Sequence, residues 1–146
     1  MHGLSGHLFK FDPQAQKVTV VTRLVSDPTY ESGMYDAFKY GYLGFTLGPD
    51  GHTIYYLTGS PSTATGAAAG EPAGEKKQEE IHFVTYNIPT GKRVDHGVLQ
   101  LENGMRPFFA ESIAIGSKNI YTVSKIREGG HLRVDLLSFP NPIRQD

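Results

Sequence analysis

A short sequence pattern occurs twice in this chain, and it limits the folds that are open to it. Residues 47–56 read LGPDGHTIYY, and residues 115–122 read IGSKNIYT, with a shorter turn. Gly48 and Gly116 take the same place in the two copies, and an Ile-Tyr pair follows each of them. Repetition of a short unit is typical of folds in which copies of one supersecondary element stack on each other. The sequence therefore predicts a repeat architecture.

A second set of matching segments accompanies the first. Residues 82–87, HFVTYN, align with residues 7–12, HLFKFD, and residues 135–139, DLLSF, form a weaker third copy. Strung together, these units contain two strands, then four, then three. Four antiparallel strands per unit are typical of a β-propeller blade.

The predicted strands are short runs of β-branched and aromatic residues between strong turn signals such as Pro-Asp-Gly and Pro-Thr-Gly. No segment longer than about ten residues has the 3.6-residue period of an amphipathic helix. We therefore predict an all-β fold. The expected strands cover residues 8–11, 17–25, 42–47, 53–57, 81–88, 93–101, 107–115, 119–123 and 132–139.

One of these units resembles a known group of repeat proteins. Residues 47–51, LGPDG, lead into Ile54 and Tyr55, and residues 86–92, YNIPTGK, follow in the next hairpin. This pattern is similar to the blade motif of the broad YVTN and quinoprotein-like propeller group. The resemblance covers one blade well and its neighbours in part, and the last unit departs from it. It implies antiparallel four-stranded blades but no single activity, because such propellers include lyases, lactonases, dehydrogenases and binding scaffolds.

The predicted strand count points to an incomplete propeller. About nine strands do not make a whole number of four-stranded blades, and propellers have about four to eight blades. We therefore expect residues 1–146 to be a single partial segment, a fragment of a larger propeller. Missing blades or other chains are then the expected partners, because open sheet edges would otherwise invite aggregation.

The blade interpretation also predicts which loops share the ligand-binding face of a propeller. These loops are residues 26–41, 59–80, 102–106 and 125–130. Residues 59–80 are rich in small and charged residues, so we expect a flexible, low-complexity loop there.

Two of these loops contain candidate ligand-binding residues. Tyr35, Tyr40 and Tyr42 belong to an aromatic cluster that also contains carboxylates, which suits sugar stacking and hydroxyl recognition. The same rings could instead fill the space between blades. Arg106 and Glu111 are expected beside an innermost strand, where the arginine could bind the carboxylate of an acidic sugar. Alternatively, these two side chains pair with each other or with water.

Several other kinds of function find no support in the sequence. The formal net charge of −1 disfavours binding to nucleic acid or to an anionic membrane. No apolar run approaches the roughly 20 residues that span a bilayer. The chain has no cysteine, and it contains no catalytic, phosphate-binding or metal-ligand spacing, so we predict neither a cofactor nor a metal site. Catalytic residues and the cellular compartment are not indicated.

Two functional hypotheses follow. The preferred one is a non-catalytic propeller segment that serves as a scaffold or as a ligand-binding surface, with glycans or small molecules as possible ligands. The alternative is a fragment of a carbohydrate-active propeller enzyme such as a polysaccharide lyase, with Arg106 and Glu111 near the site and the catalytic groups in missing blades.

Overall fold

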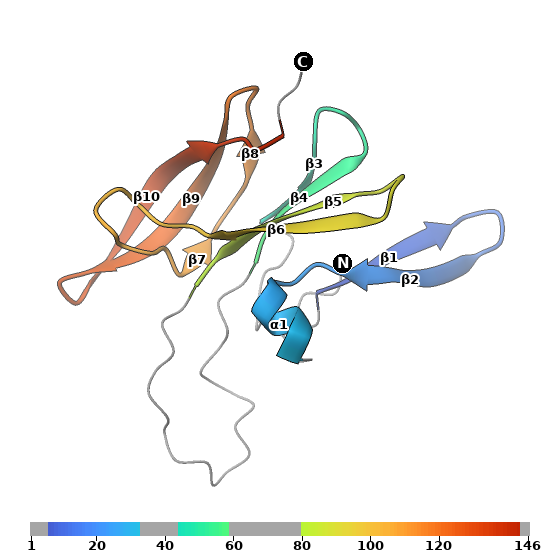
Figure 1. Ribbon diagram of the computed structural model, residues 1–146, viewed down its shortest axis with the longest axis horizontal. Coiled ribbons are helices and arrows are strands. Elements are labelled where there is room, and N and C mark those ends of the chain that lie inside the picture. The colour runs from blue at the N-terminus through green and yellow to red at the C-terminus, as the bar shows by residue number, and fades with distance from the viewer. Residues whose placement is uncertain (1–5, 33–43, 59–79, 144–146) are drawn as a thin grey trace, which may run out of the picture.

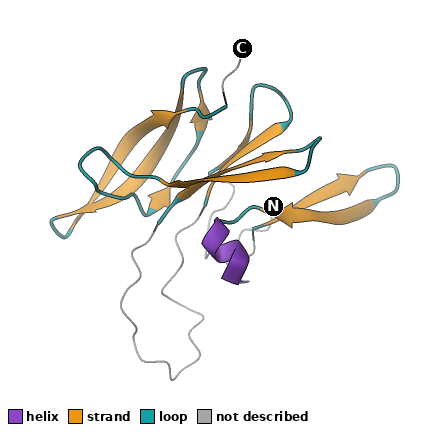
Figure 2. Cartoon of the chain, in the orientation of Figure 1, coloured by secondary structure: helices purple, strands orange, loops and turns teal. Residues whose placement is uncertain are grey.

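The computed structural model describes residues 6–32, 44–58 and 80–143. The described residues are mostly β, with one short helix, which confirms the all-β prediction (Figure 2). The elements in chain order are β1 (His7–Asp12), β2 (Lys17–Arg23), α1 (Asp27–Ser32), β3 (Phe45–Leu47), β4 (Thr53–Leu57), β5 (His82–Asn87), β6 (Lys92–Val98), β7 (Phe109–Ala110), β8 (Ala114–Ile115), β9 (Asn119–Glu128) and β10 (His131–Pro140).

The strands form three antiparallel sheets (Figure 1). Sheet 1 is the hairpin β1–β2. Sheet 2 is a four-stranded meander in the order β3-β4-β5-β6. In sheet 3, β9 pairs with β10 on one side, while β7 and β8 pair with successive parts of its other edge. The strands therefore occupy two, four and three positions, as predicted, once β7 and β8 are counted as one interrupted edge strand.

The tight turns of sheet 2 follow from local hydrogen bonding. In the β3–β4 turn, Asp50 accepts hydrogen bonds from the backbone N–H groups of His52 and Thr53 and from the Thr53 hydroxyl. The hydroxyl contributes most to a pKa of Asp50 below its ordinary value. In the β5–β6 turn, the side chain of Asn87 accepts from the backbone N–H and hydroxyl of Thr90. These side chains accept hydrogen bonds from backbone N–H groups that have no backbone acceptor within the turn.

Sheet 2 lies between the other two sheets and is covered on both faces (Figure 1). Every residue of β4 is buried. On one face, Ile54 and Tyr56 pack with residues from sheet 1 and the segment that follows it, Leu8 and Leu24. The core on the other face contains Tyr55, Leu57, Ile81, Phe83, Ala110 and Ile120. The second of these clusters joins sheet 2 to sheet 3.

The structure corrects several element boundaries. Residues 26–41 were predicted as a loop, but Asp27–Ser32 form helix α1. The hydroxyl of Ser26 accepts from the backbone N–H of Thr29 at 3.4 Å, as expected of an N-cap residue. The Ser-Asp-Pro sequence at its start is a helix signal. The prediction missed it because the helix is too short to show a 3.6-residue period.

Sheet 3 also differs in detail from the prediction. Residues 125–130 were expected to be a loop on the ligand face, but β9 continues to Glu128 and only a tight turn precedes β10. The strand predicted at residues 107–115 is divided into β7 and β8. Between them, the Ser112 carbonyl accepts a hydrogen bond from the hydroxyl of Thr122 at 2.6 Å, which replaces a regular ladder contact. β6 ends at Val98, before the predicted limit at residue 101.

Candidate functional site

The candidate ligand-binding residues lie in different parts of the chain. Tyr35, Tyr40 and Tyr42 fall outside the described residues, as does almost all of the segment 59–80. Arg106 and Glu111 are described and lie on either side of the short edge strand β7.

The structure gives Arg106 and Glu111 separate partners. Arg106 forms an ion pair with Glu80, at the start of the segment that leads into β5. Glu111 pairs with Lys125 of β9 at 2.5 Å. All four side chains are about one-third exposed. The alternative interpretation had allowed Arg106 and Glu111 to pair with each other, but each of them instead forms an ion pair with another residue.

The outer face of sheet 3, which points away from sheet 2, is a surface rich in apolar side chains. Leu132, Val134 and Leu136 alternate along β10 with residues of the opposite face, such as Phe139, which packs against the core. Their exposed fractions are 58%, 53% and 71%. Leu136 alone would contribute about 1.5–3 kcal/mol if it were fully buried. This face is not covered by any described part of the chain.

Aromatic and charged side chains continue the outer face of sheet 3 across the sheet. The β9–β10 and β7–β9 registers place Val134, Lys125 and Phe109 in one row across the three strand positions. The ammonium group of Lys125 lies 4.6 Å from the centre of the Phe109 ring while also pairing with Glu111. Arg127 lies similarly over the ring of Phe108, at 4.7 Å. Partly desolvated cation–aromatic contacts of this kind suit a surface that another layer covers.

Sheet 1 has a comparable outer face. The β1–β2 register sets Phe9 opposite Val20 and Phe11 opposite Val18. These four side chains are between 41% and 61% exposed. On the other face Leu8 is buried in the core, but Lys10 and Thr19 are exposed. The two sheets at the ends of the stack therefore both turn apolar side chains to solvent.

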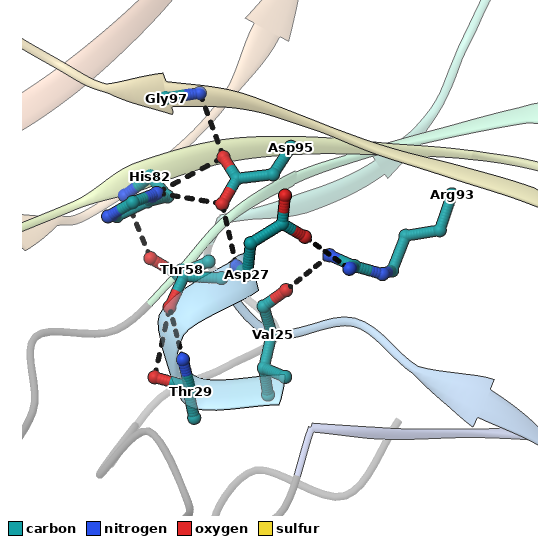
Figure 3. A network of polar contacts seen from close by, with 9 residues as sticks. Val25, Asp27, Thr29, Thr58, His82, Arg93, Asp95 and Gly97 are labelled. Carbon is teal, nitrogen blue, oxygen red and sulfur yellow. Dashed lines mark hydrogen bonds and ion pairs between the residues drawn. The ribbon is translucent and has the colours of Figure 1, made fainter. Parts of the chain in front are cut away.

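A buried polar network connects helix α1 to sheet 2 (Figure 3). Asp95 of β6 is only 4% exposed at its side chain, and its Oδ2 lies 2.8 Å from Nδ1 of His82. Backbone N–H groups of Asp27 and Gly97 donate to the same carboxylate at 2.7 and 2.8 Å. Burial acts to raise the pKa of Asp95, but these three donors outweigh it and hold the pKa below its ordinary value. The ionised form is therefore the one that the fold stabilises.

A second arm of the network holds the start of the helix from β6. Arg93 forms an ion pair with Asp27 and donates to the backbone carbonyl of Val25 at 2.9 Å (Figure 3). Its guanidinium group also lies 4.7 Å from the centre of the Tyr30 ring. Together with Asp95, these contacts fix the segment after β2 against sheet 2. Because each charged side chain of the network has a partner within the protein, we interpret the network as structural.

One pocket of about 420 Å³ lies between sheet 3 and the connection that leaves β6. Leu99, Gln100, Leu101, Glu102, Asn103 and Pro107 line one side, and residues 136–139 of β10 line the other. Its position was not predicted, because it depends on how two segments far apart in the sequence, residues 99–107 and 136–139, pack together.

The described residues contain no group of three or more His, Cys, Asp or Glu side chains placed to hold a metal ion. The helix in the described part of the chain is too short and polar to cross a membrane. No family model, no curated protein and no solved structure matches the chain. The resemblance to propellers therefore stays a prediction from the residues.

Proposed function

We propose that this chain is a non-catalytic segment of a β-propeller and acts as a scaffold in which sheets stack face to face. Sheet 2 has the sequential antiparallel order expected of a four-stranded blade. Sheet 1 then corresponds to the last two strands of a preceding blade, and sheet 3 to the first three strands of a following one.

The observation that carries this proposal is the contrast between the middle sheet and the two outer ones. The central strands of sheet 2 are buried on both faces, and sheet 3 buries one face and exposes apolar residues on the other, whereas in sheet 1 Leu8 alone is buried and its apolar residues are exposed. Burial of apolar area is worth about 25 cal/mol per Å². Covering these outer faces with further sheets would therefore stabilise the protein by the same kind of contact that already joins its three sheets.

Charge placement also favours a scaffold over a site for an anionic ligand. Arg106 and Glu111 are the described candidates for ligand binding, and both already form ion pairs. Asp95 and His82 are engaged with the helix α1 segment and with each other. A ligand would have to displace these contacts before it could use the side chains.

A cross-linking experiment tests the stacking proposal, and the absence of native cysteine makes it clean. One preparation carries Phe11→Cys on the outer face of sheet 1, and another carries Val134→Cys on the outer face of sheet 3. When the two are mixed under mild oxidation, we expect a mixed disulfide dimer to form in preference to either symmetric dimer.

The matched control replaces Ile88, which is 50% exposed but lies directly after β5, in sheet 2, rather than on an outer face. Mixtures of Ile88→Cys with either partner should cross-link only slowly. Equal rates for all three mixtures would argue against specific packing of the outer faces.

The ligand-binding part of the hypothesis has a separate test. Titration calorimetry of the chain against neutral and acidic oligosaccharides is expected to give no heat of binding. Saturable heat that disappears with Arg106→Ala, with Lys125→Ala as the comparison, would show that the Arg106–Glu80 pair opens to bind a ligand and would favour a binding surface.

A further inference from the structure

The outer edge of β10 is a long strand edge without a neighbour in the described residues. β10 extends over ten residues, His131–Pro140, and it is the terminal strand of sheet 3. Its other edge is fully paired with β9 along its whole length. On the free edge, no described strand pairs with the alternate backbone N–H and C=O groups, which makes such an edge a template for another strand.

The pocket of about 420 Å³ lies along this same edge. Four consecutive residues of β10, 136–139, contribute to its wall. Successive side chains of a strand point to opposite faces, so a pocket on one face would be lined by alternate residues only. Contact with all four indicates that the pocket runs beside the backbone edge. Its volume is within the range of about 300–1,000 Å³ that is usual for ligand sites.

The opposite wall gives the pocket a defined chemistry. Leu99, Leu101 and Pro107 provide apolar surface, and Gln100 and Asn103 provide amide groups. Glu102 is the one charged residue in the lining, and within the described part of the chain it forms no ion pair. An occupant that combines apolar side chains with a basic one would complement this wall.

We propose that the edge of β10 binds an extended segment of another polypeptide as an added strand, with apolar side chains in the pocket and a basic side chain beside Glu102. Strand addition of this kind combines backbone hydrogen bonds for affinity with side-chain pockets for specificity. Sheet 2 has a strand at the corresponding position, because β6 follows β5 there, whereas sheet 3 ends at β10. The inference concerns the edge of one sheet and does not depend on the stacking of sheet faces.

The probe is a synthetic peptide with the sequence of residues 90–101, TGKRVDHGVLQL, which includes β6 and carries two basic residues near its start. The peptide is immobilised on a sensor surface, and its affinity for the full chain in solution is measured by surface plasmon resonance. Two further peptides carry N-methyl groups at alternate residues. In one peptide the methyl groups block one edge of the strand, and in the other they block the opposite edge. Because only one edge can face β10, one of these peptides should lose at least tenfold in affinity and the other should bind like the parent.

Hydrogen exchange of the complex locates the added strand. Slower exchange of alternate amides in residues 131–140 supports the proposal, and Glu102→Gln should weaken binding severalfold without removing that protection. Protection at β5 instead would mean that the peptide displaces β6, and it would overturn the proposal. Equal binding of the two N-methylated peptides would also overturn the proposal. So would the finding that β10 pairs only with β10 of a second copy of the chain.

Discussion

Gly48 lies so close to the ring of Tyr55 that a Cβ atom at this position would come within 2.7 Å of ring atom Cε2. The Tyr55 side chain is fully buried, and its hydroxyl lies 3.4 Å from Oδ1 of Asn141. The backbone N–H of Gly48 also donates to the Thr53 carbonyl at 2.7 Å and closes the β3–β4 turn. The close packing of the Tyr55 ring therefore requires a residue without a side chain at position 48.

This packing predicts the effect of Gly48→Ala. The added methyl group must move a buried ring that has no free space, so we expect a loss of about 1–3 kcal/mol in the free energy of unfolding. Gly116 provides the comparison, because a Cβ at either glycine would lie 3.0 Å from a backbone carbonyl oxygen, of Asn119 or of Thr53. The nearest ring atom at Gly116 is 3.3 Å away, however, and belongs to Tyr121, which is 40% exposed and can move. Urea denaturation should therefore show a smaller loss for Gly116→Ala, and equal losses would contradict this explanation.

Asp95→Asn tests the network that joins α1 to sheet 2. The amide has one acceptor oxygen where the carboxylate has two, and its NH₂ group would face donors. We expect a loss of about 1–3 kcal/mol in unfolding free energy, together with faster hydrogen exchange in residues 24–32. The control is Asp135→Asn, which removes a partly exposed ion pair with Arg133 and should change stability by less than about 0.5 kcal/mol. Faster exchange in both variants would mean that the effect is not specific to the network.

The same carboxylate predicts a pH dependence with a defined sign. The pKa of Asp95 in the folded protein lies below its ordinary value of about 4, so its stabilising contribution is present above that pH. As the pH falls through the lower pKa of the folded state, the contribution is lost. The stability difference between the wild type and Asp95→Asn should thus be fully present at about pH 5 and shrink below about pH 4. A difference that grows at low pH would be inconsistent with this assignment.

Two neighbouring hydroxyl groups on β9 predict opposite effects. Thr122 donates its hydroxyl to the Ser112 carbonyl at 2.6 Å, so Thr122→Val should cost about 1 kcal/mol. The hydroxyl of Ser124 is buried and has no hydrogen-bond partner in the described part of the protein. Ser124→Ala should leave the unfolding free energy unchanged or raise it by up to about 1 kcal/mol. Calorimetric melting of both variants tests this, and a clear destabilisation by Ser124→Ala would reveal a partner for that hydroxyl.

Local patterns predicted the hairpins because their causes are local. Asp50 and Asn87 form their turns with residues at most three positions away, and the sequence shows those turns directly. Helix α1 was missed because six residues are too few to establish a helical period. The N-cap at Ser26 was the available signal.

The side-chain partners could not be predicted in the same way. The Arg106–Glu80 pair joins residues 26 positions apart in the sequence. These residues come together only because sheet 2 packs against sheet 3. The contact between His82 and Asp95 depends on the β5–β6 register, which a bulge between His82 and Val84 alters. Alternation alone gives the faces of strands, but a register shift changes which side chains meet.

The solution mass of the chain, measured by light scattering behind size exclusion, decides whether the outer faces of sheets 1 and 3 pack against further sheets. The stacked-sheet account predicts that the wild type self-associates and that Phe11→Lys or Val134→Lys, each placing a charge on an exposed apolar face, shifts it to a monomer. Ile88→Lys, at a similarly exposed site outside these faces, should behave like the wild type. A wild-type chain that remains monomeric at high concentration, or one that Ile88→Lys dissociates equally well, would contradict the account.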